Sequence, residues 1–251
     1  MTSKKKSKRG TKKSSSKSSK KKEARLKSGI KGFDDISEGG IPENSINLLV
    51  GDSGSGKTIF STQFLLQGLK EREKCLFITF EEKKEIFYKN MASLGWDLKK
   101  HEDKGNFFFL EYSPQKVKTM IDEGGGEIEN IIMKHKIKRV VIDSITSFAL
   151  LFDDELQKRE AGLALFDLIK RWKVTSLLTF QENPSRRGRT ASSLEFESDS
   201  IILIYFTRKD KKRRKRFLEV LKMRGTNHSK AIHSTKILKN GFKVYKTSSK
   251  K

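Results

Sequence analysis

The sequence predicts an α/β fold in which helices cover both faces of a mostly parallel β-sheet. Short apolar runs rich in β-branched and aromatic residues alternate with helical patterns through the first two thirds of the chain, and such alternation is typical of parallel sheets. A glycine-rich segment separates the first run from the first helical pattern, as in nucleotide-binding α/β proteins. After Pro184 the pattern changes to strands joined by tight loops, which predicts an antiparallel β-meander at the sheet edge.

Each element has its own signal in the sequence. The candidate strands of the parallel part are residues 45–50, 75–80, 106–112, 139–142 and 175–180. The clearest helix is Asp154–Trp172, whose apolar residues recur at three- and four-residue intervals. The meander is assigned to residues 200–206, 217–222 and 237–245, with Asn240-Gly241 as a hairpin turn. Gly124–Gly126 lacks the lysine and hydroxyl residue of a phosphate loop, so we interpret it as the start of a helix.

The length of 251 residues predicts one folded domain, residues 28–246, between a Lys/Ser-rich basic tail, residues 1–27, and a short basic tail, residues 247–251. The net charge is +24 and is unevenly distributed. Residues 1–22 contain eleven Lys or Arg and no acid, and residues 208–216 contain eight against one Asp. The rest of the chain carries a net charge of only +6. Two appendages therefore account for most of the charge.

The N-terminal tail cannot bury enough apolar surface to offset the entropy of ordering, so it is expected to be disordered. A polycation of this kind binds nucleic acid non-specifically, binds anionic lipid, or only increases solubility, and the sequence leaves these alternatives open. No stretch of about 18 apolar residues is present, which predicts no membrane insertion and a cytoplasmic protein. Cys75 is the single cysteine and begins an apolar run, so we expect it to be buried without a disulfide.

The glycine-rich segment fills every position of the Walker A phosphate-binding loop, G-x-x-x-x-G-K-[ST]. Its residues are Gly51, Asp52, Ser53, Gly54, Ser55, Gly56, Lys57 and Thr58. In such a loop, backbone N–H groups and the N-terminus of the next helix surround the phosphates. Lys57 is expected to reach the β- and γ-phosphates, and Thr58 to offer its hydroxyl to Mg²⁺. The segment therefore predicts a nucleoside triphosphate site.

Two further strand ends place carboxylates where this chemistry needs them. Asp143 ends the apolar run 139–142 and is expected to order Mg²⁺ beside Thr58, directly or through water. Glu81 and Glu82 follow the run 76–80. In one large branch of the ATPases with a Walker A loop, this position holds a group that orients or deprotonates the attacking water. The alternative for both glutamates is an acidic first turn that favours the next helix through its dipole. The pattern alone does not decide between these readings.

Six motifs follow one another in an order that resembles the KaiC-like ATPases of the RecA superfamily. They are SGI-x-GFDD at 28–35, GGIP at 39–42, the loop at 51–58, FEE at 80–82, VIDSIT at 141–146 and KMRGT-x-H at 222–228. The resemblance extends from about residue 28 to residue 245. It implies a three-layer αβα RecA-like core that binds ATP and Mg²⁺. It also implies a homo-oligomeric ring, commonly a hexamer, with ATP between neighbouring subunits.

The resemblance also assigns roles to individual residues. Glu81 and Glu82 match the catalytic glutamates of the family, whereas Lys222 and Arg224 match residues that reach the γ-phosphate of a neighbouring subunit. Without the family, these two cations fit the solvent face of an edge strand. One domain is present where the clock protein has two, so a circadian or autokinase role is not supported.

The sequence is compatible with three functional hypotheses. The first is an Mg²⁺-dependent ATPase that uses its nucleotide state to control an unidentified partner protein. The second is an assembly or signalling subunit with slow or absent turnover. The third is a RecA-like motor on nucleic acid, favoured by the basic tail and the segments 186–189 and 208–216, although no aromatic residues alternate with these basic clusters as a stacking platform needs.

Gln181 and two histidines carry weaker signals. Gln181 ends the run 175–180 and is a candidate sensor of the γ-phosphate. His228 and His233 have no cysteine or carboxylate at ligand spacing, so no metal site besides that for Mg²⁺ is predicted.

Overall fold

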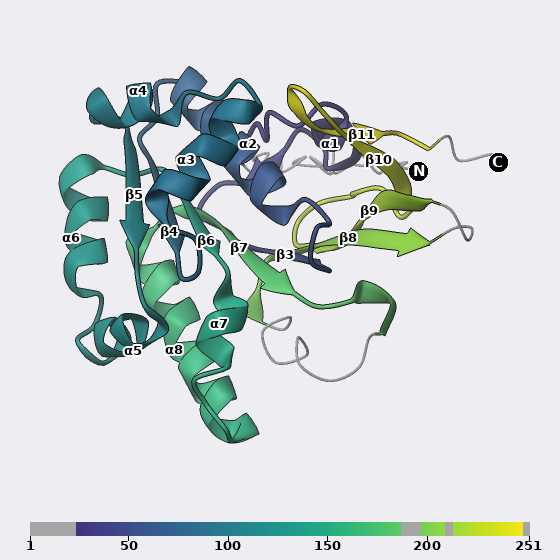
Figure 1. The fold of residues 1–251 in the computed structure, drawn as a ribbon. Coiled ribbons are helices and arrows are strands. Elements are labelled where there is room, and N and C mark those ends of the chain that lie inside the picture. The colour runs from purple at the N-terminus through teal and green to yellow at the C-terminus, as the bar shows by residue number, and fades with distance from the viewer. Residues whose placement is uncertain (1–23, 187–196, 209–212, 248–251) are drawn as a thin grey trace, which may run out of the picture.

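A computed structural model describes residues 24–186, 197–208 and 213–247. Most of the predicted basic tail lies outside these ranges, as do residues 187–189, residues 209–212 and residues 248–251, which belong to the other predicted basic segments. Figure 1 shows a central β-sheet with helices on both faces. No helix of the described ranges is long and apolar enough to cross a membrane.

Within the described residues, nine strands form the central sheet in the order β11-β10-β9-β8-β3-β7-β6-β4-β5. The six strands from β8 to β5 in this order are mutually parallel, whereas β8, β9, β10 and β11 pair antiparallel. The bounds are β3 Ile46–Gly51, β4 Cys75–Thr79, β5 Phe107–Glu111, β6 Arg139–Asp143, β7 Thr175–Gln181, β8 Ser200–Arg208, β9 Arg214–Met223, β10 His233–Leu238 and β11 Gly241–Tyr245. The predicted mostly parallel sheet with an antiparallel C-terminal meander is therefore confirmed.

The strand side chains alternate between two hydrophobic cores, one on each face of the sheet. In β3, Leu49 belongs to the first core, and Leu48 and Val50 belong to the second. The first core is covered by α2 Lys57–Lys70, α3 Lys84–Ser93 and α4 Leu98–Asp103. The second is covered by α5 Pro114–Asp122, α6 Gly126–His135, α7 Ile145–Ala149 and α8 Glu155–Trp172. Because successive strand residues point to opposite faces, runs that are apolar throughout require helices on both sides, which gives the predicted three layers (Figure 1).

The predicted helix boundaries are reproduced closely. Asp154 is the N-cap of α8, and its side chain accepts a hydrogen bond from the backbone N–H of Gln157 at 3.2 Å. This contact satisfies one of the N–H groups that have no partner within the helix. Gly125 precedes α6, so the glycine triplet does begin a helix.

The N-terminal segment differs from the prediction. Arg25 and Leu26, which the sequence assigned to the disordered tail, form strand β1 and pair antiparallel with β2, Ile41–Pro42. The Leu26 side chain is buried, and Arg25 Nη2 donates to Thr226 Oγ1 at 2.5 Å. These contacts come from residues distant in sequence, so the local composition did not reveal them. The short helix α1, Phe33–Ile36, follows this segment.

The C-terminal hairpins also differ in detail. Leu238 pairs with Gly241, so the residues of the β10–β11 turn are Lys239 and Asn240, one position earlier than predicted. Strand β8 extends to Arg208 and β9 begins at Arg214, so Arg208 and residues 214–216 of the second basic segment belong to paired strands of the sheet. The prediction for Cys75 is confirmed, since its side chain is fully buried and burial raises the pKa of its thiol.

Candidate nucleotide-binding site

The phosphate loop lies between the end of β3 at Gly51 and the start of α2 at Lys57. Its glycines are required by their surroundings. A Cβ atom on Gly51 would lie 2.7 Å from the carbonyl oxygen of Ile204, and one on Gly56 would lie 2.7 Å from Cδ1 of Ile237. Gly56 also has a φ of 104°, which L side chains rarely adopt. The loop can therefore keep this shape only with glycine at these positions.

Lys57 folds back across the loop that precedes it. Its Nζ donates hydrogen bonds to the carbonyl oxygens of Gly51 at 2.8 Å and Asp52 at 3.1 Å. Burial lowers the pKa of Lys57, because the charged ammonium loses hydration, while Asp143 opposes this shift. The two carbonyls hold the ammonium at the wall of the cavity that the loop encloses.

Asp143 and Thr58 meet at the same wall of this cavity. Thr58 Oγ1 donates to Asp143 Oδ2 at 2.6 Å, and the hydroxyl of Thr179 donates to the other carboxylate oxygen. Strand β6 places Asp143 at the carboxyl edge of the sheet, and neighbouring β7 places Thr179 beside it. Burial raises the pKa of Asp143, and the two hydroxyl donors oppose that shift.

These oxygen atoms suit Mg²⁺. The ion prefers hard oxygen ligands, and in phosphate-transfer sites it takes one or two from the protein and the rest from phosphates and water. A hydroxyl and a carboxylate 2.6 Å apart at the mouth of a phosphate loop meet that requirement. No group of three or more His, Cys, Asp or Glu residues in the described chain could hold a metal ion by itself.

The structure separates the two candidate catalytic glutamates. Glu81 Oε1 accepts hydrogen bonds from Ser144 Oγ at 2.8 Å and from the Ser147 hydroxyl, and Glu81 lines the phosphate cavity. Glu82 Oε1 instead accepts from Asn90 Nδ2 at 2.8 Å. Both glutamates line a neighbouring cavity of about 470 Å³, but of the two only Glu81 also lines the phosphate cavity. The water-activating position therefore fits Glu81 better than Glu82.

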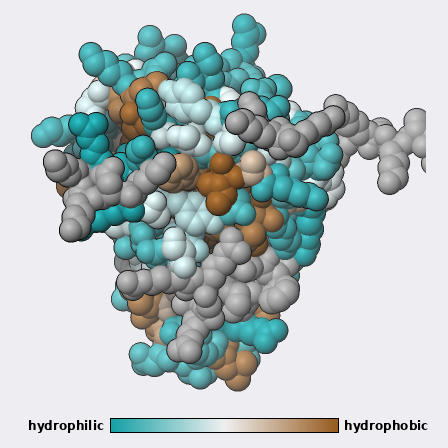
Figure 2. Space-filling model, turned by 90° about the vertical axis from the view of Figure 1, so that its right-hand side faces the viewer, coloured by the Kyte–Doolittle hydropathy of each residue, from teal (hydrophilic) through white to brown (hydrophobic). Residues whose placement is uncertain are grey.

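The phosphate cavity has a volume of about 340 Å³ and lies at the carboxyl edge of the parallel strands. Its lining residues are Ser53, Gly54, Gly56, Lys57, Thr58, Ile59, Glu81, Asp143, Ser144, Gln181, Arg216 and Ile237. Figure 2 views the molecule from the side toward which β7 and β8 point in Figure 1, and residues of intermediate hydropathy gather near the centre of that face. The cavity thus collects groups from six segments of the sequence.

Lys222 and Arg224 do not join this cavity. Lys222 lies opposite Ile201 in the sheet, and the Arg224 backbone N–H donates to the Asp199 carbonyl, at the start of β8. Because β8 runs parallel to β3, this end of β9 lies at the edge opposite the phosphate loop. Along the strand direction, Lys222 and Arg224 lie three and five residue positions from the level of Gly51, which is about 10–16 Å.

Contacts at the opposite edge hold these two cations. Lys222 Nζ donates to the carbonyl oxygen of Ser198 at 2.7 Å. Arg224 Nη1 lies 3.5 Å from Asp199 Oδ1, and 58% of the Arg224 side chain is exposed. Both cations are therefore directed away from the phosphate loop of their own chain.

A family model of the KaiC ATPases matches residues 26–249 of the chain. The chain belongs to the KaiC ATPase family. The circadian clock oscillator protein KaiC of Synechococcus elongatus is 37% identical over 231 residues, which cover 88% of this chain and 44% of that protein. The circadian clock protein KaiC3 of Synechocystis is 34% identical over 215 residues, covering 82% and 42%. The chain therefore spans less than half the length of these curated relatives.

A KaiC-like protein from the hyperthermophilic archaeon Pyrococcus horikoshii has the same architecture. Its crystal structure matches this KaiC-family chain with a TM-score of 0.79 and 35% sequence identity, covering 89% of this chain and 100% of that one. The predicted resemblance and the predicted RecA-like ATPase fold are thereby confirmed. The expected ATP-binding class follows from the family, whereas the roles of single site residues stay predictions.

Sequence reasoning missed several residues of the site. The hydroxyls of Ser144 and Ser147 contact the Glu81 carboxylate, and that of Thr179 contacts the Asp143 carboxylate. Thr79 Oγ1 accepts hydrogen bonds from the backbone N–H groups of Glu81 and Glu82. A signal existed for the two threonines, because each is a hydroxyl residue near the carboxyl end of a buried strand. Thr79 is the last residue of β4, and Thr179 lies two positions before the end of β7. Arg216 gave no such signal, since it lies in a basic segment that resembles a solvated surface.

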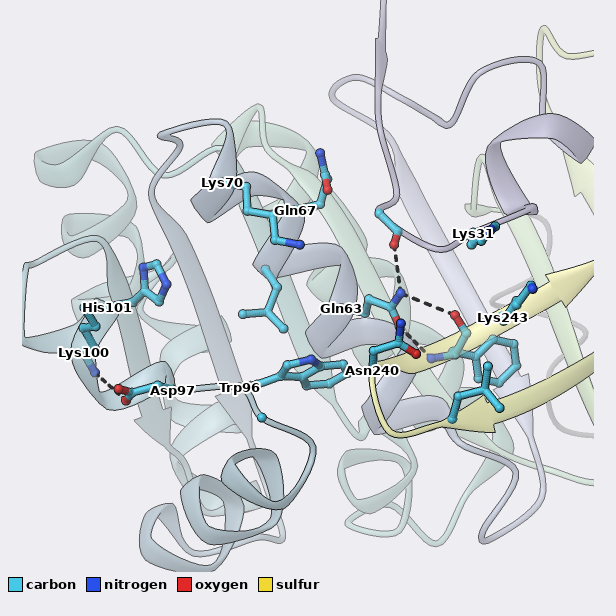
Figure 3. Close-up of a pocket in the computed structure, with 15 residues that line it drawn as sticks. Lys31, Gln63, Gln67, Lys70, Trp96, Asp97, Lys100, His101, Asn240 and Lys243 are labelled. Carbon is cyan, nitrogen blue, oxygen red and sulfur yellow. Dashed lines mark hydrogen bonds between the residues drawn. The ribbon is translucent and has the colours of Figure 1, made fainter.

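A larger cavity lies elsewhere on the molecule, between α2, the segment 95–101 and the β10–β11 hairpin (Figure 3). Its volume is about 650 Å³. Its cationic lining residues include Lys31, Lys70, Lys100 and Lys243. Ile237 lines the phosphate cavity and the next residue, Leu238, lines the larger one, so the hairpin separates the two. The larger cavity contains none of the predicted site residues. Cavity size alone therefore does not locate the nucleotide site.

Proposed function

We propose that this protein is an Mg²⁺-dependent ATPase that assembles into a ring, with ATP at the interfaces between subunits. The observation that carries the proposal is the meeting of Thr58, Asp143 and Glu81 around one phosphate loop. A binding module alone needs the loop and its lysine. The additional carboxylate at the cavity wall, held by two serine hydroxyls, is what hydrolysis requires.

Each residue would act from the position it already occupies. Lys57 would exchange its two carbonyl partners for the β- and γ-phosphates of ATP, which offer it stronger, charged acceptors. Thr58 and Asp143 would hold Mg²⁺, which when bound neutralises charge on the phosphates. Glu81 would orient or deprotonate the attacking water, with Ser144 and Ser147 fixing its carboxylate.

The positions of Lys222 and Arg224 support a shared site. These cations lie too far from the phosphate loop of their own chain to reach a bound γ-phosphate. A neighbouring subunit could present them to that phosphate, where negative charge accumulates in the transition state. Turnover would then depend on assembly, and a hexameric ring is the form that the family resemblance favours.

The cellular role follows from the same arrangement. Because nucleotide would lie between subunits, its hydrolysis would change the contacts between them and so the surface offered to a partner protein. We therefore propose a nucleotide-controlled regulator that acts in the cytoplasm through its folded domain. Slow turnover in an assembly subunit is the alternative, because the hydrogen bonds that hold Glu81 could also keep its carboxylate from the attacking water.

Two measurements test the proposal. Phosphate release by the purified wild-type chain is compared with that of Glu81→Gln, and the particle mass is measured with and without Mg·ATP. We expect release that the substitution reduces strongly, and a ring that nucleotide stabilises. Equal release by both proteins would contradict the catalytic role of Glu81, and a monomer that hydrolyses ATP would contradict the shared site.

A further inference from the structure

Arg216 lies against the phosphate loop of its own chain. Its Nε donates to the carbonyl oxygen of Ser55 at 3.1 Å, and its Nη2 donates to the carbonyl oxygen of Gly54 at 2.9 Å. The guanidinium also stacks on Phe206, with 4.1 Å between Cζ and the ring centroid. Phe206 and Arg216 are paired residues of β8 and β9, so the rigid sheet holds the cation in place.

These two hydrogen bonds restrain consecutive peptide groups of the loop. In a planar trans peptide the C=O and N–H bonds point in opposite directions. Holding the Ser55 carbonyl toward Arg216 therefore directs the N–H of Gly56, a cavity-lining residue, the opposite way. Holding the Gly54 carbonyl likewise fixes the peptide whose N–H, on Ser55, closes a turn onto the Asp52 carbonyl at 3.1 Å.

The loop needs such a restraint. Gly54 and Gly56 both have positive φ values, 71° and 104°, and glycine loses more conformational freedom on ordering than other residues. A loop that is ordered before the nucleotide arrives avoids this entropic cost at binding. The guanidinium supplies two donors in a rigid plane, which a lysine cannot reproduce.

We propose that Arg216 is a positioning residue that holds the phosphate loop in its nucleotide-binding shape from within the same subunit. Its role differs from that of Lys222 and Arg224, which lie at the opposite edge and would act on a neighbour. The inference rests on the proposed function only in that the loop must bind ATP. It does not depend on ring assembly or on turnover.

The test compares Arg216→Gln with Arg214→Gln. Arg214 lies two residues earlier on β9, and its Cζ is 5.2 Å from the centroid of the same Phe206 ring, but its guanidinium forms no hydrogen bond to the phosphate loop, which lies within the described residues. Both variants remove one positive charge from the same face of the same strand. Affinity for Mg·ATP is measured by titration calorimetry on the full-length protein. We expect Arg216→Gln to weaken binding about tenfold and Arg214→Gln to change it less than about twofold.

Hydrogen exchange of the ligand-free proteins gives a second readout. We expect faster exchange of the amides in the loop, residues 52–58, in Arg216→Gln, with unchanged exchange in β3, β6 and β7. Arg216→Lys keeps the charge and should still lose most of the affinity, because one ammonium cannot bridge both carbonyls and stack on the ring.

The outcomes are distinguishable. If wild-type protein binds Mg·ATP and Arg216→Gln binds it equally well with an equally protected loop, the inference is overturned. If Arg214→Gln weakens binding as much as Arg216→Gln does, or if Arg216→Lys binds Mg·ATP as tightly as wild type, charge alone sets the affinity. The positioning role is then likewise rejected. If wild-type protein binds no ATP, the proposed function itself fails, whatever the variants do.

Discussion

The hydroxyl of Thr58 donates a hydrogen bond to Oδ2 of Asp143 across 2.6 Å, although 85 positions separate the two residues in the sequence. The contact joins the first turn of α2 to the end of β6. In ligand-free protein it satisfies a carboxylate whose burial is otherwise unfavourable. Both oxygens are suitable ligands for Mg²⁺, so metal binding would replace this hydrogen bond with two stronger interactions at the same place.

Asp143→Asn should therefore remove the Mg²⁺ dependence of the site. We expect ATP turnover to fall by about 100-fold, as when a preorganised charge is removed from a transition state. The change is nearly isosteric, and the amide can still contact Thr58 and Thr179, so the fold should persist. Phosphate release at varied Mg²⁺ concentration checks this, with Asp167→Asn on the exposed surface of α8 as the control. Full turnover in Asp143→Asn would contradict the assignment.

Glu81→Gln and Glu82→Gln should differ in their effect on turnover. Only Glu81 combines contact with the phosphate cavity and two serine donors, so its substitution should reduce phosphate release by about 100-fold or more. Glu82→Gln keeps the acceptor for Asn90 and should reduce release much less. Single-turnover assays at equal nucleotide occupancy measure both rates. The reverse order would assign water activation to Glu82.

Glu82→Gln should also change the pH dependence of stability. Burial raises the pKa of Glu82 above its ordinary value. The folded protein then holds this proton at pH values where the unfolded chain, with a pKa of about 4.3, has lost it. The contribution of Glu82 to stability therefore falls as pH rises from about 4.3 through the folded-state pKa.

Chemical denaturation of ligand-free protein at several pH values tests this expectation. Glu82→Gln should be more stable than wild type at pH 7, and the difference should shrink toward pH 4. The glutamine keeps the contact with Asn90, so a lost hydrogen bond does not obscure the comparison. A difference that stays constant with pH would show that the carboxyl group of Glu82 does not titrate abnormally.

Mixed assemblies test whether Arg224 acts on a neighbouring subunit. Lys57→Ala should lose ATP affinity by at least about tenfold, and Arg224→Ala should bind ATP yet turn it over poorly. Each variant alone is then nearly inactive. Mixed together, some interfaces combine an intact Lys57 with an intact Arg224 from the next subunit, and part of the turnover should return. No recovery in verified mixed rings would contradict the shared site.

The stability of Arg224→Ala provides the control for that experiment. The Arg224–Asp199 ion pair is largely exposed and should contribute no more than about 1 kcal/mol to folding. A melting temperature close to that of wild type would show that lost turnover does not reflect unfolding.

The sequence indicated much of the fold because its signals were local. The strand at 75–80, the helix at 154–172 and the start of α6 at Gly126 could all be recognised from apolar spacing, capping or glycine content within a few residues. The predicted tail boundary missed Arg25 and Leu26, because their pairing with β2 depends on a segment 15 or more positions away. The β10–β11 turn was shifted by one residue, since register is set by pairing across strands.

The sequence by itself determined that this protein has a Walker A loop, with Lys57 and Thr58 at positions where they can meet phosphate and metal. It also placed Asp143 and Glu81 at strand ends. Because the carboxyl ends of parallel strands meet at one edge of the sheet, this placement brings both carboxylates near the loop. Tertiary structure decided which of two adjacent glutamates faces the cavity, and that Arg216, in a segment that resembled solvated surface, contacts the phosphate loop. These outcomes depend on the register and direction of neighbouring strands, which arise only when segments distant in sequence pack together.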